Sequence, residues 1–210
     1  MSHAKFPPSG AERWLKCGYS VKMLPFYPDK ETAASKEGTR QHAIAAMHLN
    51  YATDSCDPKM QTYLDTVRSE PGDMFVERKV TIVPELCWGT ADAFKLGNYL
   101  SLFDLKWGKS MVHATKNPQL RLYALGVLRE FPLPRDASVE LAIVQPNGAT
   151  GWPTRRWNTT VQEILEFKPE VMRAIDVALG PNPPAVAGAY CFFCPAKIHC
   201  PAYLLAHGKK

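Results

Sequence analysis

The sequence predicts an α/β fold in which helices flank a central sheet. Two observations predict it. Segments with strand character follow one another between residues 74 and 107, and segments with helical periodicity lie before and after them. The expected order is helices, three strands, a helix, a strand and a helix. The turn residues favour an antiparallel meander, joined through a helix to a further strand.

The predicted helices are recognised by the residues at their starts. Ser9 and Glu12 fit a capping box, with Ser9 as the N-cap of a short first helix. Two later helices place proline at the first helical position, after Asp57 and after Asn117. The longer helices are expected at about residues 32–49, 57–68, 117–130 and 160–179, the last with a kink or break at Pro169.

The predicted strands carry β-branched, aromatic and aliphatic residues between turn signals. The dipeptide Gly97-Asn98 is typical of a hairpin turn between the second and third strands. The third strand contains Leu100, Leu102 and Leu105, so we expect it to be central and buried on both faces. The four strands are expected at residues 74–83, 86–96, 99–107 and 139–145.

Length and composition favour one soluble intracellular domain. The chain has 210 residues, of which 46% are hydrophobic, which is enough for a substantial core. No apolar run approaches the roughly 18 residues that span a membrane, and the N-terminus lacks the apolar region of a secretory signal. We therefore expect no membrane association and a cytoplasmic location, in a bacterium or a phage-infected host. The net charge of +5 suits a nucleic-acid partner but does not establish one.

Two acids and a lysine are the first candidates for a functional site. Asp104 and Lys106 are two residues apart on one predicted strand, so their side chains point the same way. Asp92 lies on the preceding strand, where the hairpin brings it near Asp104. Close carboxylates repel unless a cation lies between them, and hard oxygen ligands suit Mg²⁺ or Mn²⁺. The alternative is a pair of solvated residues on a surface hairpin, which the apolar third strand disfavours.

Four further polar residues could join this site. Gln119 and Tyr123 lie one helical turn apart, so their polar ends share one face and could hold a phosphate or the lysine. His42 could reach the acids from its helix as a nitrogen ligand, although a single helical histidine also has ordinary structural roles. Glu77 is a further candidate, and its alternative is an outward-facing acid flanked by basic residues.

The cysteines form a second candidate site. Cys191, Cys194 and Cys200 are spaced compactly, and three thiolates need a fourth ligand. His199 could complete a Cys₃His zinc site, or Cys17 could complete a Cys₄ site that joins the two ends of the chain. Four cysteines suit both zinc and an iron–sulfur cluster. The remaining two cysteines, Cys56 and Cys87, are interpreted as spare buried thiols.

Four motifs together resemble the RecB-like branch of the PD-(D/E)XK nuclease superfamily. They occur in the family order, and the resemblance covers roughly residues 9–205. Two departures are a missing proline before Asp92, where Ala91 stands, and an aspartate rather than a glutamate at Asp104. The four motifs are Gly38-Thr-Arg-Gln-His42, Gly89-Thr-Ala-Asp92, Asp104-Leu-Lys106 and Gln119-x-x-x-Tyr123.

The resemblance implies a restriction-endonuclease-like core with a mixed central sheet flanked by helices. It implies that Lys106 positions the attacking water and that Gln119 and Tyr123 organise the site and the DNA strand. It also implies the ligands of a Mg²⁺ or Mn²⁺ ion: His42, Asp92, Asp104 and the backbone carbonyl of Leu105.

The resemblance also bears on the cysteines. CRISPR-associated RecB-like exonucleases and AddB-type nucleases carry one cysteine before the nuclease core and three after it, and they hold a [4Fe–4S] cluster. The implied ligands of such a cluster here are Cys17, Cys191, Cys194 and Cys200, with Zn²⁺ as the alternative cofactor. The implied organisation is a single nuclease domain, 1–210, with a core at 30–180 and an iron–sulfur-stapled helical region at 9–20 plus 185–205.

The expected function is therefore a metal-dependent DNA exonuclease that acts on single strands or DNA ends, in recombination, repair, or phage or CRISPR DNA processing. Two alternatives are a catalytically weak DNA-binding or recombination accessory protein and a zinc-stapled interaction protein. The intact acids and Lys106 disfavour the accessory protein. The zinc-stapled interaction protein would leave Asp92, Asp104 and Lys106 unexplained. A helicase, recombinase or integrase could be a partner, since the chain has no Gly-x-x-x-x-Gly-Lys loop of its own.

Overall fold

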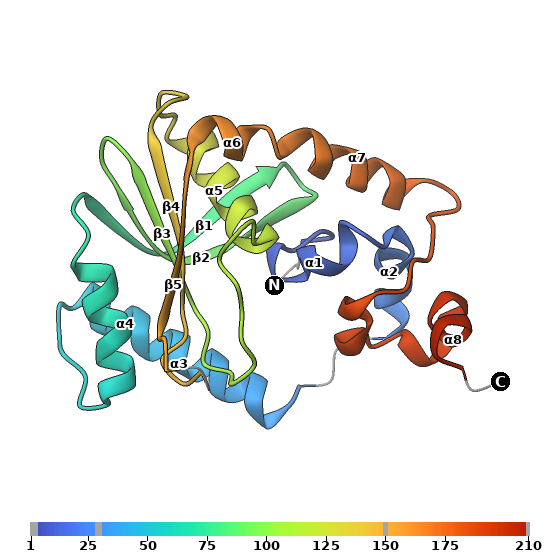
Figure 1. The fold of residues 1–210 in the computed structure, drawn as a ribbon, viewed down its shortest axis with the longest axis horizontal. Helices are drawn as coiled ribbons and strands as arrows, with labels where there is room; N and C mark the ends of the chain where they lie inside the picture. The colour runs from blue at the N-terminus through green and yellow to red at the C-terminus, as the bar shows by residue number, and fades with distance from the viewer. Residues whose placement is uncertain (1–3, 28–30, 149–150, 209–210) are drawn as a thin grey trace.

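The computed structural model describes residues 4–27, 31–148 and 151–208. Residue 30, where the sequence placed the start of the nuclease core, lies outside these ranges, as do residues 1–3 and 209–210 of the expected domain. The fold is α/β, with a mixed sheet between helices (Figure 1). The predicted fold class is confirmed at this level.

The sheet has five strands in the order β1-β2-β3-β4-β5. Strands β1, β2 and β3 form the expected antiparallel meander, and β3 then pairs with β4 in parallel, which places β3 at the centre. A fifth strand pairs antiparallel with β4 at the edge. The strands are β1 (Asp73–Val83), β2 (Cys87–Leu96), β3 (Leu100–Leu105), β4 (Ser138–Val144) and β5 (Thr154–Thr160).

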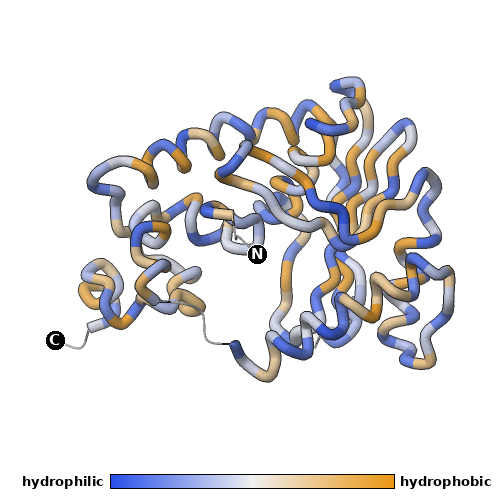
Figure 2. The backbone as a smooth tube through the Cα atoms, turned by 180° about the vertical axis from the view of Figure 1, so that it is seen from behind, coloured by the Kyte–Doolittle hydropathy of each residue, from blue (hydrophilic) through white to orange (hydrophobic). Residues whose placement is uncertain are grey.

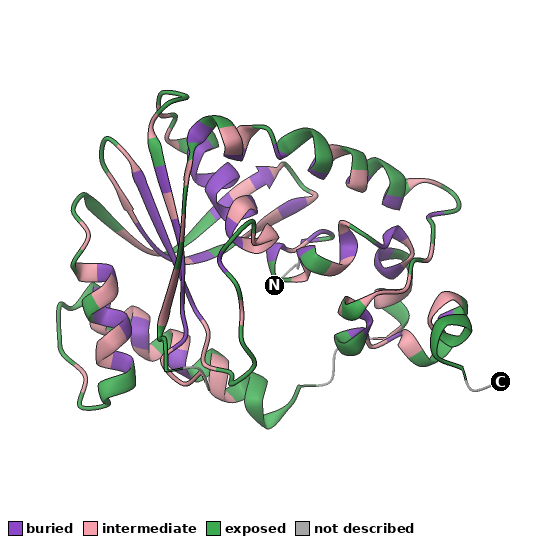
Figure 3. Cartoon of the chain, in the orientation of Figure 1, coloured by how far each residue is buried: buried purple, intermediate pink, exposed green. Residues whose placement is uncertain are grey.

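Two layers of helices cover the sheet. Helices α3 (Ala33–Asn50) and α4 (Pro58–Arg68) share one apolar cluster with the sheet, and α5 (Pro118–Glu130) shares the other. All six residues of β3 are buried, as its leucines predicted. Figure 3 shows the buried residues concentrated in the sheet and on the helix faces that meet it, and Figure 2 shows hydrophobic residues along the strands.

Side-chain caps start the three helices that flank the sheet. Thr32 accepts a hydrogen bond from the backbone N–H of Ser35, and Asp57 accepts one from Lys59. Asn117 accepts from the N–H groups of Gln119 and Leu120, the first residues after proline in α5. The caps satisfy N–H groups that have no partner inside the helix. These starts were predicted from the sequence and are confirmed.

The start of the first helix was predicted wrongly. Residues Pro8–Gly10 form a 3₁₀ turn, and α1 (Ala11–Trp14) has Gly10 as its N-cap without a side-chain cap, so Ser9 does not have the predicted role. Pro8 opens the turn earlier than the capping-box pattern suggested.

Other boundaries differ by smaller amounts. Strand β3 ends at Leu105 rather than at residue 107, and β5 was not predicted. The predicted break in the last long helix lies between α6 (Val161–Leu165) and α7 (Lys168–Leu179), with Pro169 in the first turn of α7. Of the two cysteines interpreted as buried thiols, Cys87 is buried but Cys56 is exposed.

The two ends of the chain lie side by side. Helix α7 runs from the sheet towards the short N-terminal helices, and the chain then turns back beside α1 and α2 (Gly18–Met23) (Figure 1). The N–H of Tyr19 donates to the carbonyl of Pro184 at 3.1 Å. The C-terminal segment continues with two 3₁₀ turns, Ala189–Phe193 and Lys197–His199, and α8 (Pro201–His207). Among the helices of the described residues, none has the length and apolar character required to cross a membrane.

Candidate functional site

The candidate site lies where β2 and β3 separate. The two strands pair from Leu96 opposite Leu100 to Ala93 opposite Phe103, and the pairing ends there. Asp92 is the next residue of β2. Its carboxylate accepts a hydrogen bond from the N–H of Leu105 at 2.7 Å, so a side chain satisfies a backbone donor beyond the last strand pair. We call Asp92, Asp104, Leu105 and Lys106 the strand fork.

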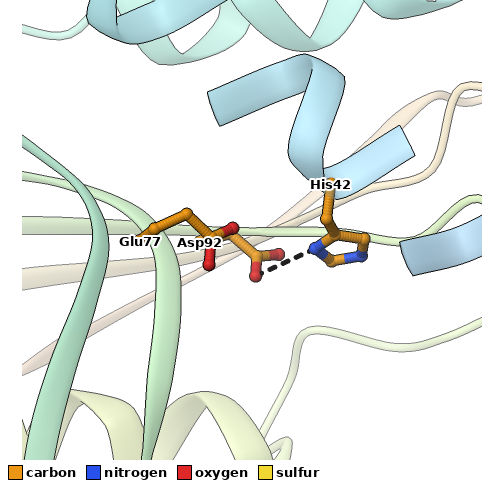
Figure 4. A group of neighbouring side chains, drawn as sticks. All are labelled: His42, Glu77 and Asp92. Carbon is orange, nitrogen blue, oxygen red and sulfur yellow. Dashed lines mark ion pairs between the residues drawn. The ribbon is translucent and has the colours of Figure 1, made fainter. Parts of the chain in front are cut away.

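Two residues from other elements approach Asp92. Nδ1 of His42, on α3, lies 3.1 Å from its carboxylate, and the two side chains are 30% and 12% exposed. Glu77 lies on β1 between the paired positions Val76 and Arg78, opposite the position of Asp92, and its φ of 48° is unusual for a non-glycine residue. Ligand atoms of His42, Glu77 and Asp92 all lie within 4.8 Å of one another (Figure 4).

The charges of this group perturb its titration. Partial burial and the nearby carboxylate of Asp92 raise the pKa of Glu77 to about 7. Burial alone would lower the pKa of His42, but its hydrogen bond to Asp92 and the charges of Asp92 and Asp104 outweigh that effect and raise it. Crowded carboxylates beside an imidazole that is drawn towards its protonated form are a set of groups whose repulsion a divalent cation would relieve.

Asp104 forms the second half of the site. It is buried, and its carboxylate contacts the ammonium of Lys106 at 2.7 Å and the amide of Gln119 at 2.9 Å. Gln119 Oε1 in turn accepts from Lys106 at 3.0 Å, and Gln119 Nε2 lies 3.5 Å from the hydroxyl of Tyr123. The four predicted residues from β3 and α5 therefore form one hydrogen-bonded network.

Burial and the charge of the partner have opposite effects on the pKa values of Asp104 and Lys106. Burial raises the pKa of Asp104, and the neighbouring Asp92 adds to the rise, while Lys106 opposes it. For Lys106, burial favours the neutral amine, but the attraction of Asp104 outweighs it and raises the pKa. Lys106 is thus an ammonium at neutral pH, which donates hydrogen bonds and does not accept protons.

A divalent cation fits the donor set that His42 and Glu77 form together with the acids of the strand fork. An imidazole nitrogen and carboxylate oxygens are ligands that Mn²⁺ accepts, and Mg²⁺ accepts the oxygens. Of the predicted ligands, the structure places His42 and Asp92 close together, and it adds Glu77. It places Asp104 in the network with Lys106 and Gln119 rather than within that close group.

Sequence reasoning underrated Glu77 and missed Tyr63. The pattern of acidic Glu77 beside basic Arg78 is typical of a solvated strand position, and no sequence signal marks its φ. Tyr63, on α4, is fully buried, and burial together with the charges of Asp92 and Asp104 raises its pKa well above the ordinary value. A signal for Tyr63 would have been its place on the buried stripe of α4.

The cysteines form a separate pocket. Cys17, at the N-terminal end of α2, and Cys191, Cys194 and Cys200 of the C-terminal segment are all buried, and all four line one pocket. His199, the alternative fourth ligand, does not line it and stacks on Tyr27 instead, with ring centroids 4.8 Å apart. We call the four cysteines the cysteine pocket.

The cysteine pocket is linked to the backbone by few contacts. The thiol sulfur of Cys17 accepts from the N–H of Val186 at 3.5 Å, and that of Cys191 accepts from Gly188 at 3.4 Å. Burial raises the pKa of Cys194. Within the described ranges, no three of the four sulfurs lie within 4.8 Å of one another. In a tetrahedral zinc site the sulfurs would be about 3.8 Å apart, given Zn–S bonds of about 2.3 Å.

Comparison with known proteins identifies a family. The chain matches the model of DUF2800, a family described as a protein of unknown function, over residues 3–74 and 61–207, and it belongs to that family. Among solved structures, it is similar to the crystal structure of SSO0001, with 14% sequence identity and a TM-score of 0.45. That match covers 97% of this chain and 89% of the other.

Proposed function

We propose that this member of the DUF2800 family is a metal-dependent deoxyribonuclease that acts on single-stranded DNA or DNA ends. The observation that supports the proposal is the strand fork. Asp92 and Asp104 come from neighbouring strands where the pairing of β2 and β3 ends; Asp92 lies close to His42 and Glu77, and Asp104 contacts Lys106 and Gln119. We further propose that this fork is the catalytic edge of a PD-(D/E)XK-type core.

The proposed cation site uses residues of three elements. His42, Asp92 and Glu77 already lie close together, and Asp104 could join them by exchanging its contact with Lys106 for the cation. A bound Mg²⁺ or Mn²⁺ would supply Lewis-acid charge at a phosphodiester and lower the pKa of an attacking water. In hydrolysis the water oxygen bonds to phosphorus and the bond from phosphorus to the leaving oxygen breaks. The attacking water gives up a proton to solvent, and the leaving oxygen takes one up from solvent.

Lys106 has the proposed role of positioning that water and the phosphate. Its ammonium carries three donors, of which one bonds Gln119; if Asp104 moves to the cation, the other two are available for a water and a phosphate oxygen. Gln119 bonds both Lys106 and Asp104, so its amide holds the two side chains in a fixed relation. Tyr123 supports Gln119 from the next helical turn. Such support keeps a reacting group within a narrow range of positions, which is a large part of catalysis by orientation.

The cysteine pocket is proposed to hold a [4Fe–4S] cluster. Four cysteines from both ends of the chain line it, and four cysteine thiolates are the ligand set of such a cluster. A cluster there would tie the N-terminal helices to the C-terminal segment. Its proposed role is structural, because the pocket and the strand fork draw on different elements.

A second candidate function is DNA binding without cleavage. It is favoured by one observation: Asp104 already has an ion pair with Lys106 and a hydrogen bond from Gln119, so this carboxylate has partners without a cation. The two functions differ in whether DNA is hydrolysed when a divalent cation is supplied.

A cleavage assay separates these functions. The purified protein is incubated with end-labelled single- and double-stranded DNA in Mn²⁺, and the products are resolved by length. The nuclease proposal predicts cleavage by the wild type and a loss of at least about a hundredfold in Lys106→Ala and in Asp104→Asn, as expected when a group that acts on the transition state is removed.

Matched controls remove the same chemical groups elsewhere. Lys168→Ala and Asp136→Asn change exposed residues outside the strand fork, and each should retain wild-type activity. Thermal unfolding of every variant checks that a loss of activity is not a loss of fold. DNA binding without cleavage by the wild type would support the second function, and undiminished cleavage in both fork variants would exclude the assignment of the site.

A further inference from the structure

The segment between the strand fork and α5 is unusually basic. It runs from Trp107 to Lys116, and no acidic residue occurs between Asp104 and Glu130. Within it, Lys109, His113 and Lys116 are exposed. In the part of the chain that the structure describes, neither Lys109 nor Lys116 forms an ion pair. We call residues 107–116 the basic loop.

A buried glutamine gives the basic loop a defined shape. Gln145, at the end of β4, is 1% exposed, and its amide nitrogen donates to the carbonyls of Gly108 at 2.6 Å and Ser110 at 2.7 Å. Its amide oxygen accepts from the N–H of Val112 at 3.3 Å and from the guanidinium of Arg155. One side chain thus satisfies three backbone groups of a segment that has no regular secondary structure.

Two more residues complete this support. Arg155, on β5, donates to the carbonyl of Val112 at 2.7 Å, and Asn147 donates to that of Trp107 at 3.1 Å. At the far end, the side chain of Asn117 donates to the carbonyl of His113 at 2.9 Å. The loop backbone is therefore held to β4, β5 and the start of α5, so the attachment points of its lysine side chains are defined without any ligand.

The basic loop adjoins the strand fork at both ends. It begins directly after Lys106, and it ends before Gln119, which bonds Lys106 and Asp104. Its exposed cations are therefore carried on the segment that connects Lys106 with Gln119. Two exposed lysines in a stretch of sequence without acidic residues are complementary to a polyanion whose charges repeat along its length.

We propose that the basic loop binds the phosphate backbone of a single DNA strand and leads it to the strand fork, and that Gln145 is the positioning residue of this contact. The proposal rests on the proposed nuclease function for the identity of the polyanion. It adds a binding surface and a residue that the acid and lysine motifs do not include. Lys109 and Lys116 contact phosphates, and the backbone held by Gln145 sets the distance between them.

The test measures binding without cleavage. Fluorescence anisotropy of a labelled single-stranded oligonucleotide is recorded in EDTA, over a series of KCl concentrations, for the wild type and for Lys109→Ala/Lys116→Ala. Loss of two phosphate contacts should weaken binding about tenfold at low salt and reduce the slope of log K against log[KCl] by about 1.4. The control, Lys168→Ala/Arg173→Ala, removes the same charge from exposed positions on α7 and should bind like the wild type.

Gln145→Leu tests the positioning role. It leaves every charge of the basic loop in place, so we expect weaker binding through misplaced lysines. Combined with the double lysine variant, it should cause no further loss, because the contacts it positions are already gone. If Gln145→Leu weakened binding through a general structural defect, it would cause the same loss of affinity in the wild type and in the double lysine variant.

The outcomes separate the two proposals. Wild-type affinity in the double lysine variant, or a loss equal to that of the α7 control, would overturn the inference, as would a wild type that does not bind the oligonucleotide. Salt-dependent binding that requires Lys109 and Lys116, in a protein that cleaves no DNA in Mn²⁺, would support the basic loop and reject the nuclease proposal.

Discussion

The strand fork and the cysteine pocket differ in how their polar groups are satisfied. At the fork, Asp92 bonds His42 and the N–H of Leu105, and Asp104 bonds Lys106 and Gln119. In the pocket, four buried thiols line one cavity, and the hydrogen bonds of Cys17 and Cys191 are long ones to the backbone, at 3.4–4.0 Å. The fork is also built at the end of β3, whose residues are all buried, whereas the pocket joins short helices from the two ends of the chain.

This difference indicates which region depends on a bound cofactor. The fork has enough internal hydrogen bonds and ion pairs to keep its geometry without a metal, so a metal there should affect activity more than folding. The segments that carry the four cysteines are short helices and turns. A cofactor bound by all four cysteines should therefore contribute directly to the stability of the region around the pocket. The following variants test this contrast, from the largest expected effect to the smallest.

The cysteine variants should have the largest effect. Cys191→Ser removes a proposed cluster ligand, so we expect loss of the visible absorbance and of the bound iron, and rapid proteolysis of the C-terminal segment. Cys56→Ser is the matched control, because Cys56 is exposed and outside the pocket, and it should retain both properties. Absorbance, metal analysis and limited proteolysis of anaerobically purified protein measure the outcome. A colourless wild type with stoichiometric zinc would contradict the iron–sulfur proposal.

Loss of Lys106 should destabilise the sheet in a pH-dependent way. Lys106→Met leaves Asp104 buried without its cation, which should lower the free energy of unfolding by about 3 kcal/mol. The folded-state pKa of Asp104 is raised above its unfolded value, so stability is fully present below the unfolded pKa and is lost as pH rises through the folded pKa. Without Lys106 that pKa rises further, so the difference from wild type should grow with pH.

Urea unfolding at several pH values measures this effect. The double variant Lys106→Met/Asp104→Leu removes both charges and should recover most of the stability, because no charge is left unpaired. A stability difference between Lys106→Met and wild type that is the same at acid and alkaline pH would show that Asp104 is not the group responsible.

Replacing either of two glycines with alanine should change the free energy of unfolding least, and the two changes should have opposite signs. Gly18 lies in α2, where an added Cβ would be 3.1 Å from Ala178 on α7 and from Pro183. Gly18→Ala should therefore loosen the packing beside the cysteine pocket and destabilise the protein by about 1–3 kcal/mol. Gly38, in α3 near His42, has nothing within 4 Å of an added Cβ. Gly38→Ala should stabilise the helix by up to about 1 kcal/mol.

Thermal unfolding of the two variants measures the contrast. Melting temperatures that change in the same direction would show that the close approach of α2 and α7 is not what requires Gly18. An unchanged cleavage rate in Gly38→Ala, if the nuclease proposal holds, would show that the helix carries His42 without needing flexibility at residue 38.

The elements with strong local signals could be predicted from the sequence. Asn117 and the proline after it mark the start of α5, and the leucines of β3 mark a strand buried on both faces. Strand β5 has no such signal. Its residues Thr154–Thr160 are mostly polar, because it lies at the edge of the sheet and pairs only with β4. Its strand character therefore comes from pairing with β4 rather than from its own composition.

The candidate site could be predicted in part for similar reasons. Asp104 and Lys106 are two residues apart on the predicted strand, so their side chains should point the same way. The structure places the Lys106 ammonium 2.7 Å from the Asp104 carboxylate. The proximity of Glu77 to His42 and Asp92 depends on the local distortion at Glu77, which no spacing rule reveals. The approach of Cys17 to the C-terminal cysteines depends on the course of α7; the sequence left Cys17 and His199 open as the fourth ligand, and a resemblance to other proteins favoured Cys17.

Locating a bound Mn²⁺ ion tests the central proposal most directly. Crystals of the protein soaked in Mn²⁺ and measured near the manganese absorption edge would give an anomalous peak at each bound ion. The proposal predicts a peak at the strand fork, in contact with Asp92 and His42, which disappears in Asp92→Asn crystals of the same form. A peak confined to other sites, or an equal peak at the fork in Asp92→Asn, would contradict it.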